Sequence, residues 1–277
     1  MIIHVDVAGG QIVGSRDHQE DFFVIHRDVV LDDKKKGILA ILCDGMGGHS
    51  KGEIASKLAC ETFYDRFINY AELDLRDRLH FSLVSANDAI QAAVKENPEY
   101  SKMGTTLVAL VIYRNLLHWI SVGDSPLWLK RKRKLRRLNA DHSMAPVLDK
   151  LAEIGEITAE EAISDKGRNQ LRSALTGSKV GLINISNDPL TLASGDEIVL
   201  ASDGLKSLET DEISHLLSMS RSRSAEIQTL ALLEEVSRKN QNSQDNTTVV
   251  ILKCDSKARK SASKLMTVTS KIRSKLF

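Results

Sequence analysis

An aspartate marks one end of an apolar run at four places along the chain. Asp44 follows ILAILC, Asp124 follows HWISVG, Asp203 follows EIVLAS, and Asp245 comes just before TTVVIL. A single aspartate in such a position is usually a turn former or a helix cap. Four of them, each beside Gly, Ser or Asn, predict that rigid strands carry carboxylates to one rim of a sheet.

Carboxylates gathered in this way repel one another. Two of them ~4 Å apart repel by roughly 4 kcal/mol at an effective dielectric constant of about 20, so the cluster calls for a compensating cation. The available ligands are oxygens, with no accompanying set of Cys or His, which favours the hard cations Mg²⁺ or Mn²⁺. Calcium is disfavoured because the sequence contains no D-x-[DN]-x-[DN]-G loop.

The glycine-rich segment DGMGGHSKG, residues 44–52, invites comparison with nucleotide-binding loops. Ser50 occupies the place of the third glycine of GxGxxG, and Lys51 does not follow the glycine pair that a Walker lysine requires. Nucleotide binding is therefore disfavoured. The glycines let the backbone approach a metal closely, and we expect Gly45 to offer its carbonyl as a ligand.

The elements that position these residues follow from the apolar pattern. Short runs rich in β-branched residues predict buried strands at 37–43, 105–112, 116–122, 197–201 and 247–252. Apolar residues at three- and four-residue spacing predict helices at 51–67, 75–96, 144–163 and 225–239. Strands cluster without regular alternation with helices, so we expect an α+β layer structure with antiparallel sheets rather than a parallel doubly wound sheet.

Composition limits the class of protein. The 277 residues are 42% apolar and 27% charged, as in ordinary globular chains, and the net charge of +1 removes the general argument for a nucleic-acid binder. Cys43, Cys60 and Cys254 are odd in number and form no CxxC pair, which disfavours a disulfide framework or a zinc site. Neither a secretory leader nor an apolar run of about 18 residues occurs, so we expect a cytoplasmic protein.

Two segments are strongly basic. The run LWLKRKRKLRRL, residues 127–138, predicts a hairpin with a solvated tip at 130–134 rather than a nucleic-acid patch. Residues 256–277 carry seven Lys or Arg and no acidic residue. We expect a catalytic domain over residues 1–255, followed by a basic tail that is either a disordered extension or an amphipathic helix making weak membrane or partner contact.

Eight ordered segments resemble the motifs of one protein family. They are SRDHQEDFF (15–23), LCDGMGGHSKGE (42–53), MGTTL (103–107), VGDSPLWL (122–129), DHS (141–143), LTGS (175–178), LASDGL (200–205) and QDNTTV (244–249). In order and spacing they resemble the PPM, or type 2C, metal-dependent protein serine/threonine phosphatases over residues 9–253, and DGMGGH is the form typical of bacterial members. The resemblance implies a four-layer fold, a central antiparallel β-sandwich flanked by α-helices.

The resemblance also implies two Mg²⁺ or Mn²⁺ ions at one end of the sandwich. Asp44 would bridge both ions, and Asp203 with Asp245 would complete the coordination of one. Glu20 and the carbonyl of Gly45 would serve the other ion.

Further roles follow from the same resemblance. Asp21 would support the ligands from behind, and Asp124 would contribute to a third, weaker ion. Arg16 resembles the arginine that binds the substrate phosphate, and its planar guanidinium suits phosphate oxygens. Met46 stands where some members carry a histidine that is proposed to protonate the leaving alkoxide. The nearby His49 is then the candidate general acid, with water as the alternative.

The implied activity is hydrolysis of phosphoserine and phosphothreonine by direct attack of a hydroxide that two divalent metals activate. The implied partners are a phosphorylated protein and an opposing serine/threonine kinase, as in bacterial signalling, with no specific nucleic acid. Residues 144–174 resemble the family's flap and are candidates for substrate selection. Three alternatives stay open: a catalytically inactive phosphoprotein binder, a phosphatase for small phosphate esters, and a binder of nucleic acid or anionic membranes through the basic segments.

Overall fold

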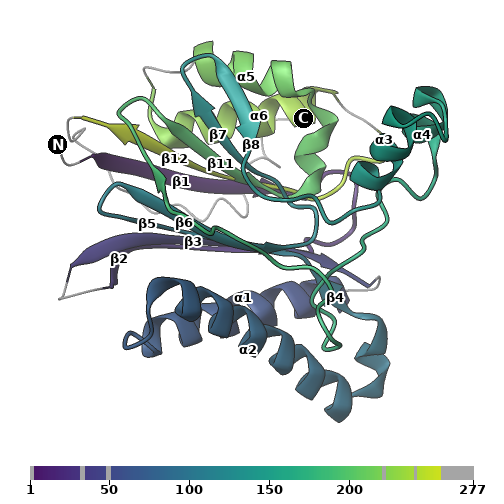
Figure 1. Cartoon of the computed structure of the whole chain (residues 1–277), viewed down its shortest axis with the longest axis horizontal. Coiled ribbons are helices and arrows are strands. Elements are labelled where there is room, and N and C mark those ends of the chain that lie inside the picture. The colour runs from purple at the N-terminus through teal and green to yellow at the C-terminus, as the bar shows by residue number, and fades with distance from the viewer. Residues whose placement is uncertain (1–2, 32–34, 48–50, 220–222, 240–241, 257–277) are drawn as a thin grey trace, which may run out of the picture.

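In the computed structural model, residues 3–31, 35–47, 51–219, 223–239 and 242–256 are described. Two antiparallel sheets pack face to face, and helices cover both outer faces (Figure 1). The predicted α+β fold with a central antiparallel sandwich in four layers is confirmed. The predicted general acid His49 and the basic tail beyond residue 256 lie outside the described residues.

The first sheet has the strand order β1-β12-β11-β7-β8 among the described residues, with every neighbouring pair antiparallel. Its strands are β1 (His4–Ile12), β12 (Thr247–Asp255), β11 (Glu197–Ala201), β7 (Leu127–Arg131) and β8 (Lys134–Arg137). The strand β1 was not predicted, because its sequence HVDVAGGQI mixes polar residues and glycines with few large apolar side chains.

The second sheet has the order β10-β6-β5-β3-β2, with β4 paired to β3 and β9 paired to β6. Its strands are β2 (Asp21–Val30), β3 (Lys36–Met46), β4 (Gly104–Thr105), β5 (Leu107–Tyr113), β6 (Leu116–Val122), β9 (Asn184–Ile185) and β10 (Leu190–Thr191). Of these, β2, β9 and β10 were not predicted. Neighbouring strands run antiparallel, as expected.

The strand β3 is apolar on both faces because it lies between two layers. Side chains alternate along a strand, so Ala40 and Leu42 enter the core between the sheets, while Leu39, Ile41 and Cys43 enter the core beneath the helices. All five are fully buried. Burying a large aliphatic side chain contributes about 1.5–3 kcal/mol, which anchors the strand that ends at the predicted metal-binding segment.

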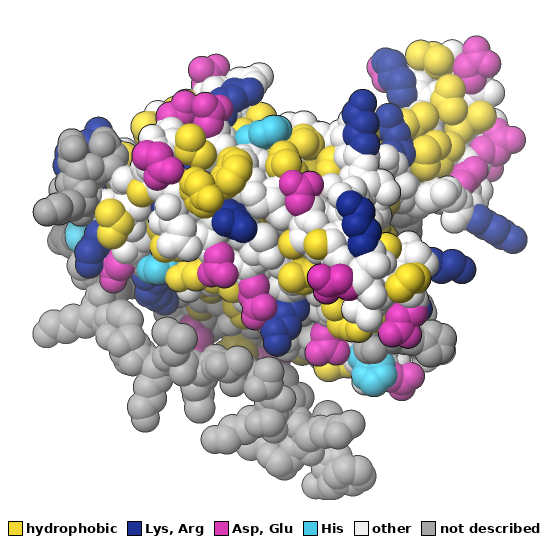
Figure 2. Space-filling model, turned by 90° about the horizontal axis from the view of Figure 1, so that it is seen from below, with side chains coloured by type: hydrophobic (Ala, Val, Ile, Leu, Met, Phe, Trp, Pro, Cys, Tyr) yellow, Lys and Arg dark blue, Asp and Glu magenta, His cyan; other side chains and the backbone are white. Residues whose placement is uncertain are grey.

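Two helix pairs form the outer layers. The helices α1 (Lys51–Asn69) and α2 (Leu75–Glu96) cover the second sheet, and α5 (Thr210–Met219) and α6 (Ala225–Lys239) cover the first (Figure 1). Asp74 caps α2 by accepting hydrogen bonds from the N–H groups of Arg76 and Asp77. On the face seen from below, described acidic and basic side chains are interspersed, as on a solvated helix layer (Figure 2).

The predicted helix over 144–163 is two helices. α3 (Ala145–Glu153) and α4 (Ala159–Ser164) project from one end of the sandwich (Figure 1). Gly155 has a φ of 78° in the connection, a conformation that glycine adopts without steric cost and that ends a helix. Thr158 and Glu161 then form a reciprocal capping box that starts α4.

The predicted basic hairpin forms from β7 and β8, but the prediction of a solvated tip over 130–134 is wrong for Lys130. Lys130 is 2% exposed, and its ammonium lies 3.1 Å from the carboxylate of Glu197 on the neighbouring strand. The guanidinium of Arg131 lies 2.7 Å from Asp196. Because β7 lies between β8 and β11, acidic side chains of the β11 region neutralise these charges.

The three cysteines are free and buried. Within the described residues, no helix combines the length and the apolar character that a membrane span requires.

Candidate active site

A cleft of about 730 Å³ opens where strands of both sheets end. Most of the predicted site residues line it: Arg16, Glu20, Asp44, Gly45, Asp124, Asp203 and Asp245. Asp21 does not line the cleft but lies behind it, as described below. The cleft is completed by residues 169–174 on the loop that follows α4.

Strand register explains why carboxylates so distant in sequence meet here. In the first sheet Ala201 lies opposite Val249, so the end of β11 and the start of β12 share one edge. Asp203 follows β11 by two residues and Asp245 precedes β12 by two. In the second sheet Asp44 lies close to the end of β3. The cleft therefore receives carboxylates from both sheets.

The MGTTL segment holds the backbone of Asp44. The hydroxyl of Thr105 and the N–H of Thr106 both donate to the carbonyl of Asp44, each at 2.9 Å. The Asp44 N–H donates to the Thr106 hydroxyl at 3.2 Å. The Asp44 carboxylate also accepts a long hydrogen bond of 3.4 Å from the N–H of Asp203, so the two sheets make polar contact at this point.

Burial and mutual repulsion raise the pKa values of these carboxyls. For Asp44 burial is the largest cause, followed by the charges of Asp21 and Asp203, and its pKa lies well above the ordinary value. Burial, followed by the charge of Asp124, raises the pKa of Asp203 to about 6. Burial also raises the pKa of Glu20. The negative charge of these carboxylates is thus only partly offset by the positively charged side chains around the cleft.

Asp21 supports the turn before Asp203. It is 4% exposed, and its carboxylate accepts hydrogen bonds of 2.7 Å from the hydroxyls of Ser202 and Thr248. Burial nonetheless raises the pKa of Asp21 to about 7. Because Ser202 directly precedes Asp203, this carboxylate lies where it can fix that turn without entering the cleft.

Asn246 anchors the loop that carries Arg16 and Glu20. Its side-chain amide donates to the carbonyls of Val13 at 2.8 Å and His18 at 2.9 Å, and its oxygen accepts from the N–H of Glu20 at 2.7 Å. The QDNTTV segment includes Asn246, but its sequence predicts no role for this residue. The sequence shows only an amide between Asp245 and the strand that begins at Thr247, and its burial is seen only in the structure.

Gly45 lets two backbone segments approach closely. Its N–H donates to the carbonyl of Glu20 at 3.1 Å. A Cβ at this position would lie 2.1 Å from the carbonyl oxygen of Gly52 and 2.5 Å from that of Glu20. Real Cβ atoms do not approach backbone this closely, so any larger residue would push Glu20 away from Asp44.

Cationic side chains stand at the edge of the cleft. The guanidinium of Arg16 lies 2.6 Å from the Asp245 carboxylate, with side-chain exposures of 56% and 40%. An ion pair this exposed contributes little to stability, so Arg16 is free to exchange Asp245 for an anionic ligand. Arg172 and Lys179 also line the cleft, and both are exposed.

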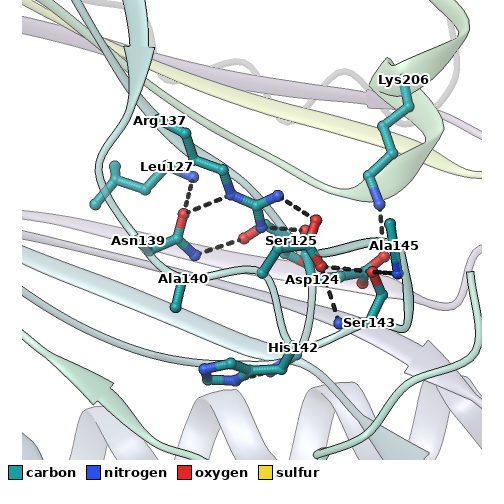
Figure 3. A network of polar contacts seen from close by, with 12 residues as sticks. Asp124, Ser125, Leu127, Arg137, Asn139, Ala140, His142, Ser143, Ala145 and Lys206 are labelled. Atoms are coloured by element: carbon teal, nitrogen blue, oxygen red, sulfur yellow. Dashed lines mark hydrogen bonds and ion pairs between the residues drawn. The ribbon is translucent and has the colours of Figure 1, made fainter. Parts of the chain in front are cut away.

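Asp124 belongs to a connected polar network on the cleft wall (Figure 3). Its carboxylate accepts from the ammonium of Lys206 at 2.6 Å, and its backbone carbonyl accepts from Arg137 at 2.7 Å. Arg137 also pairs with Asp141 at 2.6 Å, and Ser143 donates to that same carboxylate. Lys206 was not predicted. It stands three residues after Asp203, and no sequence signal linked it to Asp124.

The oxygen ligands of the cleft are of the type that a hard divalent cation prefers, but they are not gathered into a preformed site. Among the described residues, no three His, Cys, Asp or Glu side chains form a group that could hold a metal ion. The cleft nevertheless contains several carboxylates, and the pKa values of Asp44 and Asp203 are raised. At Gly45, backbone segments approach closely. Mg²⁺ and Mn²⁺ prefer oxygen ligands, and Mg²⁺ retains several waters when bound by few carboxylates, so the donor set fits these ions.

Known proteins resemble this chain over most of its length. The family described as Protein phosphatase 2C matches residues 17–245. The Serine/threonine protein phosphatase PstP of Mycobacterium tuberculosis is 35% identical over 177 residues, 63% of this chain and 33% of that protein. The matched part thus spans about a third of that relative. The Serine/threonine phosphatase stp of Listeria welshimeri is 29% identical over 214 residues, covering 76% of this chain and 81% of that protein.

The fold agrees with this relationship. The catalytic domain of PstP in complex with two manganese ions superposes with a TM-score of 0.73 at 28% identity, covering 92% of this chain and 100% of that one. The match of the family over residues 17–245 includes the segments that supply Glu20, Asp44, Asp203 and Asp245. The chain belongs to the protein phosphatase 2C family.

Proposed function

We propose that this chain is a metal-dependent protein phosphatase that hydrolyses phosphoserine and phosphothreonine. One observation carries the proposal: carboxylates from two sheets meet in an open cleft, their pKa values are raised by burial and repulsion, and Arg16 stands exposed at the edge. The names of the relatives, which are serine/threonine phosphatases, support the same activity.

Asp44, Asp203, Asp245, Glu20 and the Gly45 carbonyl are the groups that would hold Mg²⁺ or Mn²⁺. When bound, such ions supply Lewis acidity that activates water and neutralises phosphoryl oxygens. The relative that contains two manganese ions supports this part of the proposal.

The chain's own residues would bind and orient the phosphate group. Arg16 would exchange its contact with Asp245 for phosphate oxygens, because a guanidinium donates two parallel hydrogen bonds and stays charged at any working pH. The cations Arg172 and Lys179 would draw a dianion into a cleft whose floor is acidic. Direct attack of water would leave no phosphoenzyme, and His49 or water would donate the proton to the leaving alkoxide.

The natural substrate would be a phosphoprotein produced by an opposing serine/threonine kinase in the cytoplasm. The loop over 169–174 lines the cleft, so it would touch substrate residues next to the phosphate. We propose that this loop and the neighbouring α3 and α4 select the substrate.

Hydrolysis of a phosphothreonine peptide by the purified chain tests the proposal. We expect phosphate release with Mn²⁺ or Mg²⁺, none with chelator, and recovery when metal is restored. Asp203→Asn should lower kcat at least ~100-fold, the scale of losing a charged catalytic group, while leaving the circular dichroism spectrum unchanged. Full activity of this variant with Mn²⁺ would contradict the assignment of Asp203.

The same assay separates the alternatives. Release from small phosphate esters but not from peptides would favour a metabolite phosphatase. Phosphopeptide binding without hydrolysis in any metal would favour an inactive binding protein.

A further inference from the structure

Lys206 and Asp124 form an ion pair on the cleft wall (Figure 3). The ammonium lies 2.6 Å from the carboxylate. The Asp124 side chain is 5% exposed, whereas the Lys206 side chain is 36% exposed. A buried carboxylate needs a partner, and here the partner is a side chain of the same domain.

Both members of the pair are held in place. Lys206 lies on the short 3₁₀ helix η2 (Asp203–Ser207), which begins at the predicted metal ligand Asp203. Asp124 is fixed through its carbonyl by Arg137 at 2.7 Å. The neighbouring hydroxyl of Ser125 makes a 2.7 Å hydrogen bond with Thr106, which also holds Asp44. The ammonium of Lys206 therefore lies at a defined position beside the Asp124 carboxylate.

The ion pair lies beside the acidic cluster. Asp124 lines the same cleft as Asp44 and Asp203. Its carboxylate already has an ammonium at 2.6 Å, and that positive charge repels a further cation at this corner of the cleft.

We propose that Lys206 supplies the cation at Asp124, so that the cleft takes two divalent ions and Asp124 does not bind a third. The inference rests on the proposed metal-dependent function, and it differs from the expectation drawn from sequence for Asp124. A tethered ammonium is present at every metal concentration, whereas a weakly held ion is present only when metal is abundant.

Counting bound Mn²⁺ tests the proposal without measuring hydrolysis. Free Mn²⁺ is followed by electron paramagnetic resonance as metal is added to the full chain at pH 7.5. We expect two ions per wild-type chain, and one additional weaker ion in Lys206→Ser. That additional ion should disappear in the double variant Lys206→Ser/Asp124→Asn, and Lys206→Arg, which keeps the charge, should again bind two.

Lys239→Ser is the matched control. Lys239 is also partly exposed, pairs with Glu212 at 2.6 Å, and donates to the carbonyl of Ser207 on the same 3₁₀ helix, yet it does not contact Asp124. Its removal should leave the count at two. A third ion in this variant would mean that loosening the helix, rather than freeing Asp124, creates the site.

The single variant Asp124→Asn decides the question even if Lys206→Ser fails to fold. A count of two in both wild type and Asp124→Asn supports the proposal. Three ions in wild type and two in Asp124→Asn would overturn it, as would an unchanged count in a folded Lys206→Ser chain. Absence of any saturable Mn²⁺ binding to wild type would instead overturn the proposed metal-dependent function.

Discussion

At the residue scale, the surroundings of the acidic side chains in and behind the cleft disfavour their charged form. Burial is the first cause for Asp21, whose pKa is about 7, and for Asp203, whose pKa is about 6, against an ordinary value of 3.8. The folded chain therefore binds protons at pH values at which the unfolded chain has released them. These two carboxyls favour the folded state fully below pH 3.8, and this contribution is lost as pH rises through about 6 to 7.

We predict a corresponding pH dependence of thermal stability. In chelator, raising the pH from about 4 to about 7 should lower the unfolding midpoint of wild type relative to Asp203→Asn, because only wild type loses that proton. The comparison is made between variants because burial lowers the pKa of His118 and His142, which act in the opposite direction. Saturating Mn²⁺ should reverse the trend, since metal binds the deprotonated carboxylates. Parallel pH curves for the two chains would contradict the assignment.

At the element scale, the loops depend on side chains that tie them to strands. The segment carrying Arg16 and Glu20 has no regular secondary structure over residues 13–20. The three hydrogen bonds of Asn246 connect it to the start of β12. A short loop held in this way keeps Arg16, the proposed phosphate-binding residue, and Glu20, a proposed metal ligand, at fixed positions.

Asn246→Ala should therefore lower kcat/KM for a phosphopeptide by about 10- to 100-fold, the scale of misplacing catalytic groups. It should also weaken Mn²⁺ binding, because the N–H of Glu20 loses its acceptor. Asn242→Ala is the control, since Asn242 is exposed in the same connection. Equal kinetics for the two variants would show that Asn246 does not position the loop.

The hairpin of β7 and β8 gives a second prediction at this scale. Lys130 and Lys253 both pair with the buried carboxylate of Glu197, at 3.1 Å and 3.5 Å. Lys130→Met should lower the free energy of unfolding by about 1–3 kcal/mol, because Glu197 loses its shorter ion pair and keeps only the longer one with Lys253. Lys134→Met, at an exposed position, should change it by less than about 0.5 kcal/mol. Urea denaturation of both variants measures the difference.

At the scale of the whole molecule, the cleft lies where the two sheets meet. Asp44 comes from the second sheet, and Asp203 and Asp245 come from the first. A ligand bound by carboxylates of both sheets stabilises only the chain in which the sheets are packed together. The proposed metal binding and the folding of the sandwich would therefore be linked.

Mn²⁺ at about 100 times its dissociation constant should add about 2.7 kcal/mol for each bound ion. We expect the unfolding midpoint to rise on addition of Mn²⁺ and to return on chelation, with activity following reversibly. Asp44→Asn should lose most of this rise, because it removes the carboxylate contributed by the second sheet. Retention of the full rise in Asp44→Asn would show that the ions do not join the sheets.

The sequence by itself determined the class of fold and most of the acidic residues that meet in the cleft. Apolar runs predict buried strands because the burial of a strand is reflected in residues that are neighbours in the sequence. An aspartate at the end of such a run lies at the edge of the sheet, because the strand ends there. The resemblance to the type 2C phosphatases added Glu20 and Arg16, which lie in no apolar pattern and which line the cleft in the structure; their roles stay predictions. Polar strands such as β1 escaped prediction because their burial comes from a partner strand distant in sequence.

Only the tertiary structure decided which charges meet. The sequence predicts Lys130 in a solvated hairpin tip, whereas the strand order places β7 beside β11 and buries Lys130 against Glu197. The pair of Lys206 with Asp124 spans 82 positions, and the contact of Asn246 with Glu20 spans 226. Local periodicity carries no information on contacts between segments so far apart, because they depend on the order of strands in each sheet and on how the two sheets are packed.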